Sequence, residues 1–173
     1  MVDHLTEKKR SWNMSRIRSR HTKPELIIRS LLHRSGYRFR INYAKLPGNP
    51  DIVLPKHETA IFIHGCFWHR HPNCSKTTMP NTNREYWKKK FERNIKRDKK
   101  RKNELKKLGW KVITLWECNI MKDPLEVLNF VIDSLGDDNY KHPDKEISRT
   151  RIIKIAEQKS NYYLNKTTYK KNE

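Results

Sequence analysis

Apolar residues recur at helical spacing in three segments of the chain. The first follows 22–25, which has capping-box spacing with a proline in its first turn, and it stops at Gly36. The second and longest runs over 84–108 and is followed by a glycine, which helix C-caps favour. The third opens at Asp123 and stops near Gly136. We therefore expect three helices, of which the middle one is the longest.

Short apolar runs bounded by turn residues predict the strands. They lie at 39–41, 51–54, 60–64 and 112–116. Interleaved with the three helices, they indicate an α/β domain over 1–135, built on a central mixed sheet flanked by helices. We expect the polar segment 1–10 to be a mobile tail and 136–173 to be a basic C-terminal extension, either helical or disordered.

The charge is too unbalanced for a neutral metabolic enzyme. The chain has 39 Lys or Arg against 19 Asp or Glu, a net charge of +20, and 84–111 alone holds 14 of the cations and 4 of the acids. The excess cations repel one another, which favours binding to a polyanion. Nucleic acid is the first candidate, because binding its phosphates releases counterions. A membrane ranks second, but no apolar run reaches the length of a bilayer span. Since the first twelve residues lack the apolar stretch of a secretory signal, we expect a cytoplasmic protein.

Three cysteines and a histidine have the composition of a structural zinc site. Cys66, His71 and Cys74 form the spacing C-x4-H-x2-C, and Cys118 follows the last strand. Three thiolates and one imidazole make a closed tetrahedral set of ligands for Zn²⁺. Two alternatives stay open: the thiols are small buried hydrophobes, or His69 replaces His71. We prefer zinc, which would join the loop after one strand to the end of another.

A carboxylate and two histidines lie where strands begin and end. Asp51 stands at the mouth of a strand, His64 ends the next strand, and His69 follows a glycine turn. Phosphodiester hydrolysis needs a hard cation to polarise the phosphoryl oxygen and a base to accept a proton from water. Asp51 suits the first role and either histidine the second. Taken singly, Asp51 is equally explained as a turn residue, and Glu25 as the acidic member of the capping box.

Asp98 sits close to the apolar stripe of the long helix. It is seven residues from apolar positions on either side, which places it about 20° from their direction. A carboxylate aimed at the core needs a partner, and it would orient His69. The alternative is a solvent-facing salt bridge with Arg97 or Lys102. The stripe consists of Trp87, Phe91, Ile95, Leu105 and Leu108.

Aromatic residues stand among the cations. Phe67 and Trp68 follow the glycine turn, and Tyr86 and Trp87 open the basic helix. Two consecutive aromatics with ligand residues on both sides make poor core sequence, so we expect them to be exposed. Aromatics beside phosphate-binding cations are what base stacking or wedging into a duplex requires.

These motifs resemble the very short patch repair (Vsr-type) endonucleases, which are DNA mismatch nickases. The likeness runs from about residue 11 to about residue 135, and its most specific element is the run H-G-C-F-W-H over 64–69. The Glu-x-Lys of restriction-type nucleases is absent, as it is in the family, and the loop before Cys74 is one residue longer than usual. The other matching segments are Asp51-Ile-Val-Leu, Arg97-Asp98, Leu108-Gly-Trp-Lys-Val, Trp116-Glu-Cys118 and Ser11-x-Asn-Met14.

The resemblance implies a restriction-endonuclease-like three-layer core and a nick beside the thymine of a T:G mismatch in double-stranded DNA. Mg²⁺ would be held by Asp51 and the backbone carbonyl of Ile63, and His69 would act as general base with support from Asp98. The implied catalytic residues are Asp51, His64, His69, Glu25 and Asp98. The implied ligands of a structural Zn²⁺ are Cys66, His71, Cys74 and Cys118. The residues implied in DNA binding are Met14, Phe67, Trp68 and Trp87.

We also expect a monomer that acts at the nucleoid, with mismatch-repair proteins and a repair polymerase as partners. Two other functions stay open from the residues. One is a sequence-specific nuclease on the same scaffold, and the other is a zinc-stabilised DNA-binding module without catalysis. The set of Asp51, His64 and His69 argues against the module, because binding alone has no need of it.

Overall fold

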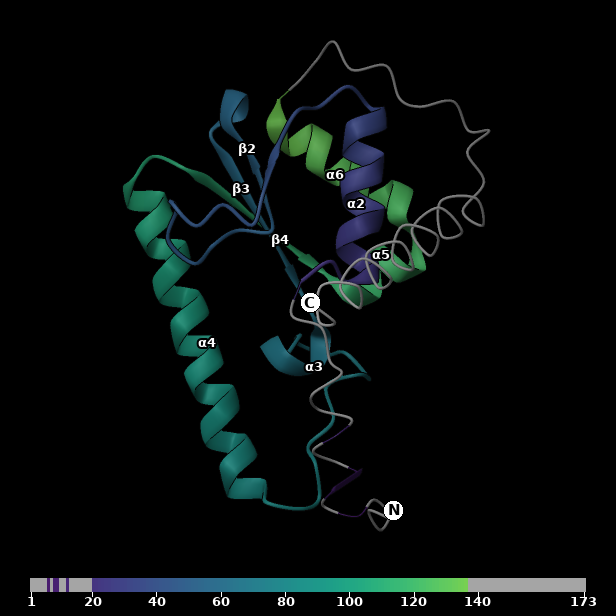
Figure 1. The fold of residues 1–173 in the computed structure, drawn as a ribbon, viewed down its shortest axis with the longest axis vertical. Helices are drawn as coiled ribbons and strands as arrows, with labels where there is room; N and C mark the ends of the chain where they lie inside the picture. Colours follow the sequence, from purple (N-terminus) through teal and green to yellow (C-terminus); the bar gives the residue numbers. More distant parts are fainter. Residues whose placement is uncertain (1–5, 7, 10–11, 13–19, 137–173) are drawn as a thin grey trace, which may run out of the picture.

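The computed structural model of the chain describes residues 6, 8–9, 12 and 20–136. Met14, most of the predicted N-terminal tail and the predicted extension beyond Gly136 lie outside the described residues. Figure 1 shows the described part as a sheet with helices around it and one long helix along its side. No helix among the described residues has the length and apolarity needed to cross a bilayer.

Four strands form one mixed sheet in the order in which they follow along the chain. The first three strands pair antiparallel, whereas the last two pair parallel in a register that joins His64 to Trp116. This confirms the predicted mixed sheet. The strands are β1 (Arg40–Ile41), β2 (Ile52–Leu54), β3 (Thr59–His64) and β4 (Lys111–Trp116).

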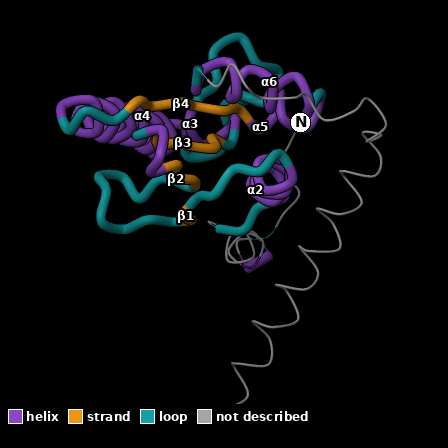
Figure 2. The backbone as a smooth tube through the Cα atoms, turned by 90° about the horizontal axis from the view of Figure 1, so that it is seen from above, coloured by secondary structure: helices purple, strands orange, loops and turns teal. Residues whose placement is uncertain are grey.

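Three helices cover one face of the sheet, as the view in Figure 2 shows. They are α2 (Lys23–Arg34), α5 (Glu117–Lys122) and α6 (Pro124–Leu135). The predicted capping box starts α2, and Asp123 caps α6 by accepting bonds from two backbone N–H groups. The main core lies between these helices and the sheet; its fully buried members include Ile27, Ile28, Leu32, Ile52, Ile61, Ile120, Leu128 and Val131.

The other face of the sheet carries α4 (Arg84–Lys107), the long basic helix. Its buried face is made of Phe91, Asn94 and Leu105, with Asp98 half-buried between them. The prediction that Ile95 and Leu108 belong to the apolar stripe is wrong, because their side chains are 48% and 59% exposed. Each points about 70° away from the mean direction of the buried face, one to either side, at 100° per residue.

Short elements complete the connections between the strands. The 3₁₀ turn η1 (Pro55–His57) joins β2 to β3, and α3 (Cys66–His69) follows β3 as a single helical turn. Neither α3 nor α5 is predicted by the sequence pattern. Because β3 and β4 run parallel, their carboxyl ends meet at one edge of the sheet and bring α3 next to the start of α5.

Candidate functional site

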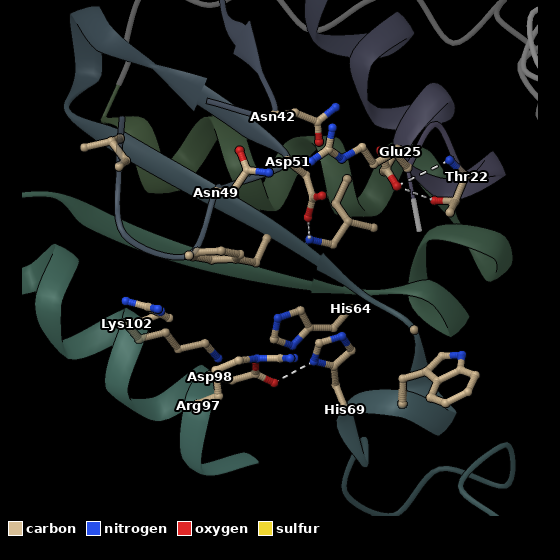
Figure 3. A pocket seen from close by; sticks show the side chains of 18 of the residues that line it. Thr22, Glu25, Asn42, Asn49, Asp51, His64, His69, Arg97, Asp98 and Lys102 are labelled. Atoms are coloured by element: carbon tan, nitrogen blue, oxygen red, sulfur yellow. Dashed lines mark hydrogen bonds and ion pairs between the residues drawn. The ribbon is translucent and has the colours of Figure 1, made fainter. Parts of the chain in front are cut away.

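An open cleft of about 1250 Å³ lies at this edge of the sheet. Its walls come from the loop over 42–49, the start of α2, Asp51 just before β2, the end of β3, α3 and the middle of α4 (Figure 3). Gly48 is tight against α4, since a Cβ there would lie 3.0 Å from the Cβ of Arg101 and 3.2 Å from the ring of Phe62. Its φ of +82° also favours glycine, so the loop is held close to the helix.

Asp51 is the residue just before β2, and its side chain points into the cleft. Its Oδ2 accepts a hydrogen bond of 2.7 Å from the backbone N–H of Ile63 on the neighbouring strand. Burial raises the pKa of the Asp51 carboxyl to about 6. The hydrogen bond from Ile63 lowers this pKa, and the charge of Glu25 raises it, but burial has the largest effect. A buried carboxylate with a raised pKa is a high-energy anion, which a bound cation would relieve.

His69 and Asp98 form a hydrogen-bonded dyad on the other side of the cleft. Nδ1 of His69 lies 2.6 Å from Oδ2 of Asp98, and both side chains are mostly buried, at 22% and 17% exposure. Burial raises the pKa of Asp98, but the hydrogen bond and charge of His69 outweigh it, so the net shift is downward. The predicted alternative partner, Arg97, also reaches the second oxygen of Asp98, at 3.4 Å. Asp98 therefore faces both the cleft and a surface cation.

His64 lies flat against His69, with ring centroids 3.8 Å apart and planes 14° from parallel. Burial lowers the pKa of His64 to about 3, and the neighbouring His69 adds to the effect, so His64 is neutral at physiological pH. The nitrogen lone pairs lie in the ring planes, so stacked rings do not readily share one ion. We therefore interpret the grouping of His64, His69 and Asp98 as a supported base, although their donor atoms lie within 4.8 Å of one another.

Glu25 belongs to a buried network that the sequence analysis did not find. Its carboxylate accepts hydrogen bonds from the backbone N–H groups of His21 and Thr22, and it pairs with Arg29 at 2.7 Å. The same nitrogen of Arg29 donates to the backbone carbonyl of Asp51 at 3.2 Å. The signal was available, because an arginine four residues after a glutamate, between Leu-Ile-Ile and Ser-Leu-Leu, favours a buried ion pair.

The three cysteines converge with one histidine, and α3 contributes Cys66 to this group. One donor atom from each of Cys66, His71, Cys74 and Cys118 lies within 4.8 Å of the others, and Nδ1 of His71 is 3.2 Å from the sulfur of Cys118. Zn–S bonds of about 2.3 Å in a tetrahedron need sulfurs closer than about 4 Å, so the donor set fits zinc with a small adjustment. The histidine in this group is His71, whereas His69 faces the cleft.

The surroundings of the cysteine group hold its loop in place. Burial raises the pKa of Cys66 to about 12, whereas hydrogen bonding from the backbone of Lys76 lowers the pKa of Cys74. The Thr77 hydroxyl donates to the carbonyl of His71 at 2.8 Å. The ring of Trp116, at the end of β4, stacks on the ring of His71 at 4.2 Å. These contacts lie where the carboxyl ends of β3 and β4 meet.

Aromatic side chains pack between α3 and α4. Phe67 contacts Trp68, Trp87 and Phe91 with ring centroids 5.1, 5.4 and 5.2 Å apart. The prediction that Phe67 and Trp68 are exposed is only partly right, because they and Trp87 are half-buried. Their mutual contacts remove part of each ring from water, while Tyr86 stays 55% exposed. The group adjoins the cleft through Trp68.

Comparison with known proteins places the chain in a family. Residues 2–76 match the family model described as DNA mismatch endonuclease Vsr. The type II nicking enzyme V.NmeAIP of Neisseria meningitidis is 42% identical over 139 residues, which cover 79% of this chain and 99% of that protein. The DNA mismatch endonuclease Vsr of Escherichia coli K12 is 42% identical over 118 residues, 68% of this chain and 75% of the relative.

A third relative, the type II nicking enzyme V.XorIIP of Xanthomonas oryzae, is 42% identical over 120 residues, 69% of this chain and 88% of its own length. The range matched by the family model includes Asp51, His64, His69 and two of the three cysteines. The matches agree with the resemblance drawn from the motifs. They indicate that this chain is a nuclease and that its partner is DNA. The chain belongs to the Vsr family of DNA endonucleases.

Proposed function

We propose that the protein nicks one strand of double-stranded DNA beside the thymine of a T:G mismatch, as the first step of very short patch repair. The observation that carries the proposal is that Asp51 and the His69–Asp98 dyad line one cleft. The name of the Escherichia coli relative, a DNA mismatch endonuclease, supports the substrate, and the names of the nicking enzymes support cleavage of a single strand.

Asp51 would hold Mg²⁺ together with the backbone carbonyl of Ile63. The fit is chemical, because Mg²⁺ prefers oxygen ligands and a buried carboxylate of raised pKa favours a cation nearby. When bound, Mg²⁺ polarises a phosphoryl oxygen and stabilises the charge that develops on it. The hydrogen bond from Ile63 keeps the Asp51 side chain directed into the cleft. Glu25 supports this residue through Arg29, which is how we propose it contributes to the active site.

His69 would act as the general base. Its Nδ1–H donates to Asp98, which leaves Nε2 free to accept a proton from the attacking water. Asp98 would stabilise the imidazolium that forms, and the low pKa that His69 gives to Asp98 keeps this carboxylate ionised. The neutral ring of His64 would stack on the ring of His69 and exclude water from that face.

The remaining predicted roles concern structure and recognition. We propose that Cys66, His71, Cys74 and Cys118 hold a structural Zn²⁺ in a restriction-endonuclease-like three-layer core. We also propose that Phe67, Trp68 and Trp87 wedge beside the mismatched pair, with Met14, which lies outside the described residues, entering from the other groove. Action at the nucleoid as a monomer, with mismatch-repair proteins and a repair polymerase as partners, stays a prediction.

A second candidate is a nicking enzyme with a different recognition site on the same scaffold. It is favoured by the relatives that are named type II nicking enzymes rather than mismatch endonucleases. The non-catalytic DNA-binding module loses its support, because the chain belongs to an endonuclease family. The two remaining candidates differ in the DNA that they cleave.

A nicking assay over duplexes tests the proposal. We expect Mg²⁺-dependent cleavage of one strand of T:G duplexes, lost in Asp51→Ala and His69→Ala while duplex binding persists. Comparable rates on perfectly paired duplexes would favour the second candidate. Full activity of either variant would overturn the catalytic assignment. The matched control is Asp133→Ala, which removes an exposed carboxylate of α6 far along the chain from these groups.

A further inference from the structure

One lysine of α4 stands apart from the other cations of the cleft wall. Lys102 lines the cleft and is half-buried. Among the residues that the structure describes, no carboxylate lies within 4.0 Å of its ammonium group, whereas its neighbours Arg97 and Arg101 are paired with Asp98 and Glu104 at 3.4 and 2.9 Å. Lys102 is therefore a partly desolvated cation that no carboxylate of the described residues contacts.

Such a cation is costly unless something negative approaches it. Burial lowers the pKa of Lys102, and the charge of Asp98 offsets only part of that effect. A lysine on a long exposed helix can usually turn its ammonium into water. The Lys102 side chain instead extends beside Asp98 along the wall of the cleft, as Figure 3 shows.

The position of Lys102 relative to the dyad indicates what the anion is. Lys102 follows Asp98 by four residues on a regular helix, so the two side chains share one face. Asp98 holds His69, whose free Nε2 would accept the proton of the water that attacks the phosphate. An anion bound by Lys102 would therefore lie beside the reacting group, on the α4 side of the cleft.

We propose that Lys102 binds a non-bridging oxygen of the scissile phosphate of the DNA strand. The inference rests on the proposed nuclease site and adds a phosphate contact to it. The strand end that lines the cleft opposite α4, Phe62-Ile63-His64, contains no lysine or arginine. A lysine from the helix would supply the missing positive charge from the opposite wall.

A double-mutant cycle between protein and DNA tests the contact. The variant is Lys102→Met, and the matched control is Lys99→Met, which removes the same charge from an exposed position one turn earlier on the helix. Binding is measured without Mg²⁺ on T:G duplexes with either normal phosphates or one neutral methylphosphonate at the nick that the wild type makes. We expect Lys102→Met to weaken binding of the normal duplex about tenfold. The slope of log binding constant against log salt concentration should fall in magnitude by about 1.

The coupling between the Lys102 substitution and the methylphosphonate shows whether the two groups are in contact. With the methylphosphonate at the nick site, Lys102→Met and the wild type should bind equally, Lys99→Met should behave like the wild type on both duplexes, and Lys102→Arg should retain most of the affinity. An undiminished Lys102→Met effect on the modified duplex, or an equal effect of Lys99→Met, would overturn the contact. The proposed function fails separately, if the wild type does not nick T:G duplexes at all.

Discussion

The guanidinium of Arg29 bridges the carboxylate of Glu25, at 2.7 Å, and the backbone carbonyl of Asp51, at 3.2 Å. Both side chains of the ion pair are nearly inaccessible, at 8% and 4% exposure. The first turns of α2 are thereby bonded to Asp51, the residue just before β2 in the cleft. The geometry of Asp51 depends on a helix that lies 22 residues earlier in the chain.

We expect Arg29→Met to destabilise the fold strongly. Removing one partner leaves the carboxylate of Glu25 buried without its cation, which typically costs about 3–5 kcal/mol. The double variant Glu25→Gln/Arg29→Met should recover more than half of that loss, because it removes both charges. Urea unfolding at pH 7 measures the two free energies, and a loss below about 1 kcal/mol in Arg29→Met would contradict a buried pair.

Asp51→Asn should abolish nicking and yet stabilise the metal-free protein at pH 7. The carboxyl pKa is about 6 in the folded chain against 3.8 for the free side chain, so the folded state binds the extra proton between these values. The stability that this residue contributes is present below pH 4 and is lost as pH rises through 6. The asparagine removes that loss, worth up to about 3 kcal/mol, and its carbonyl still accepts the bond from Ile63.

The measurement for Asp51 is a pair of thermal unfolding curves at pH 5 and pH 8, in buffer without Mg²⁺. The gain from Asp51→Asn should be larger at pH 8 than at pH 5. Asp133→Asn, which changes an exposed carboxyl, should alter neither curve by more than about 0.5 kcal/mol. A variant that is less stable than the wild type at pH 8 would show that burial does not penalise this carboxylate.

Asp98→Asn should lower kcat by at least about tenfold and leave KM nearly unchanged. The charge of Asp98 stabilises the imidazolium of His69 when the proton is taken up, and an amide lacks that charge. The control is Glu92→Gln, which removes an exposed carboxylate of the same helix. Single-turnover nicking over a pH series checks the effect. If Asp98→Asn kept the rate of the wild type, the dyad would be structural alone.

If the cysteine group holds the proposed Zn²⁺, loss of that ion should destabilise the fold. We expect about one zinc per chain by elemental analysis, lost in Cys118→Ser together with about 10 °C of Tm, since a structural ion contributes its binding free energy to folding. Asp51→Ala should keep its zinc. Protein purified without chelator that contains no zinc would refute the assignment, and so would a Tm unchanged in Cys118→Ser.

Much of the fold follows from patterns that act over a few residues. The capping box of α2, the Asp123 cap of α6 and the glycines after α2 and α6 mark the helix ends correctly, because these signals are local backbone chemistry. The short helical turn α3 escapes this kind of reasoning. Its residues, Cys66–His69, are read from the sequence as ligands and aromatics rather than as a helix, and four residues show no periodicity.

What joins distant segments was harder to predict. The His69–Asp98 dyad was predicted, since a carboxylate near an apolar stripe demands a partner. The Arg29–Asp51 bond was missed, because nothing in the sequence says which carbonyl a buried guanidinium will reach. The assignment of Ile95 to the core failed because a hydrophobic residue 70° off the buried face of α4 still fits a loose helical stripe.

One turn of helix separates Cys66, in the cysteine group, from His69, in the cleft. The distance along the helix axis is about 5 Å, too short for any hinge between them. On the proposed roles, a freshly synthesised chain that has not yet captured its ion also has no base in working position. The nuclease would then be inert until its scaffold is complete, which would protect DNA from an incompletely folded enzyme.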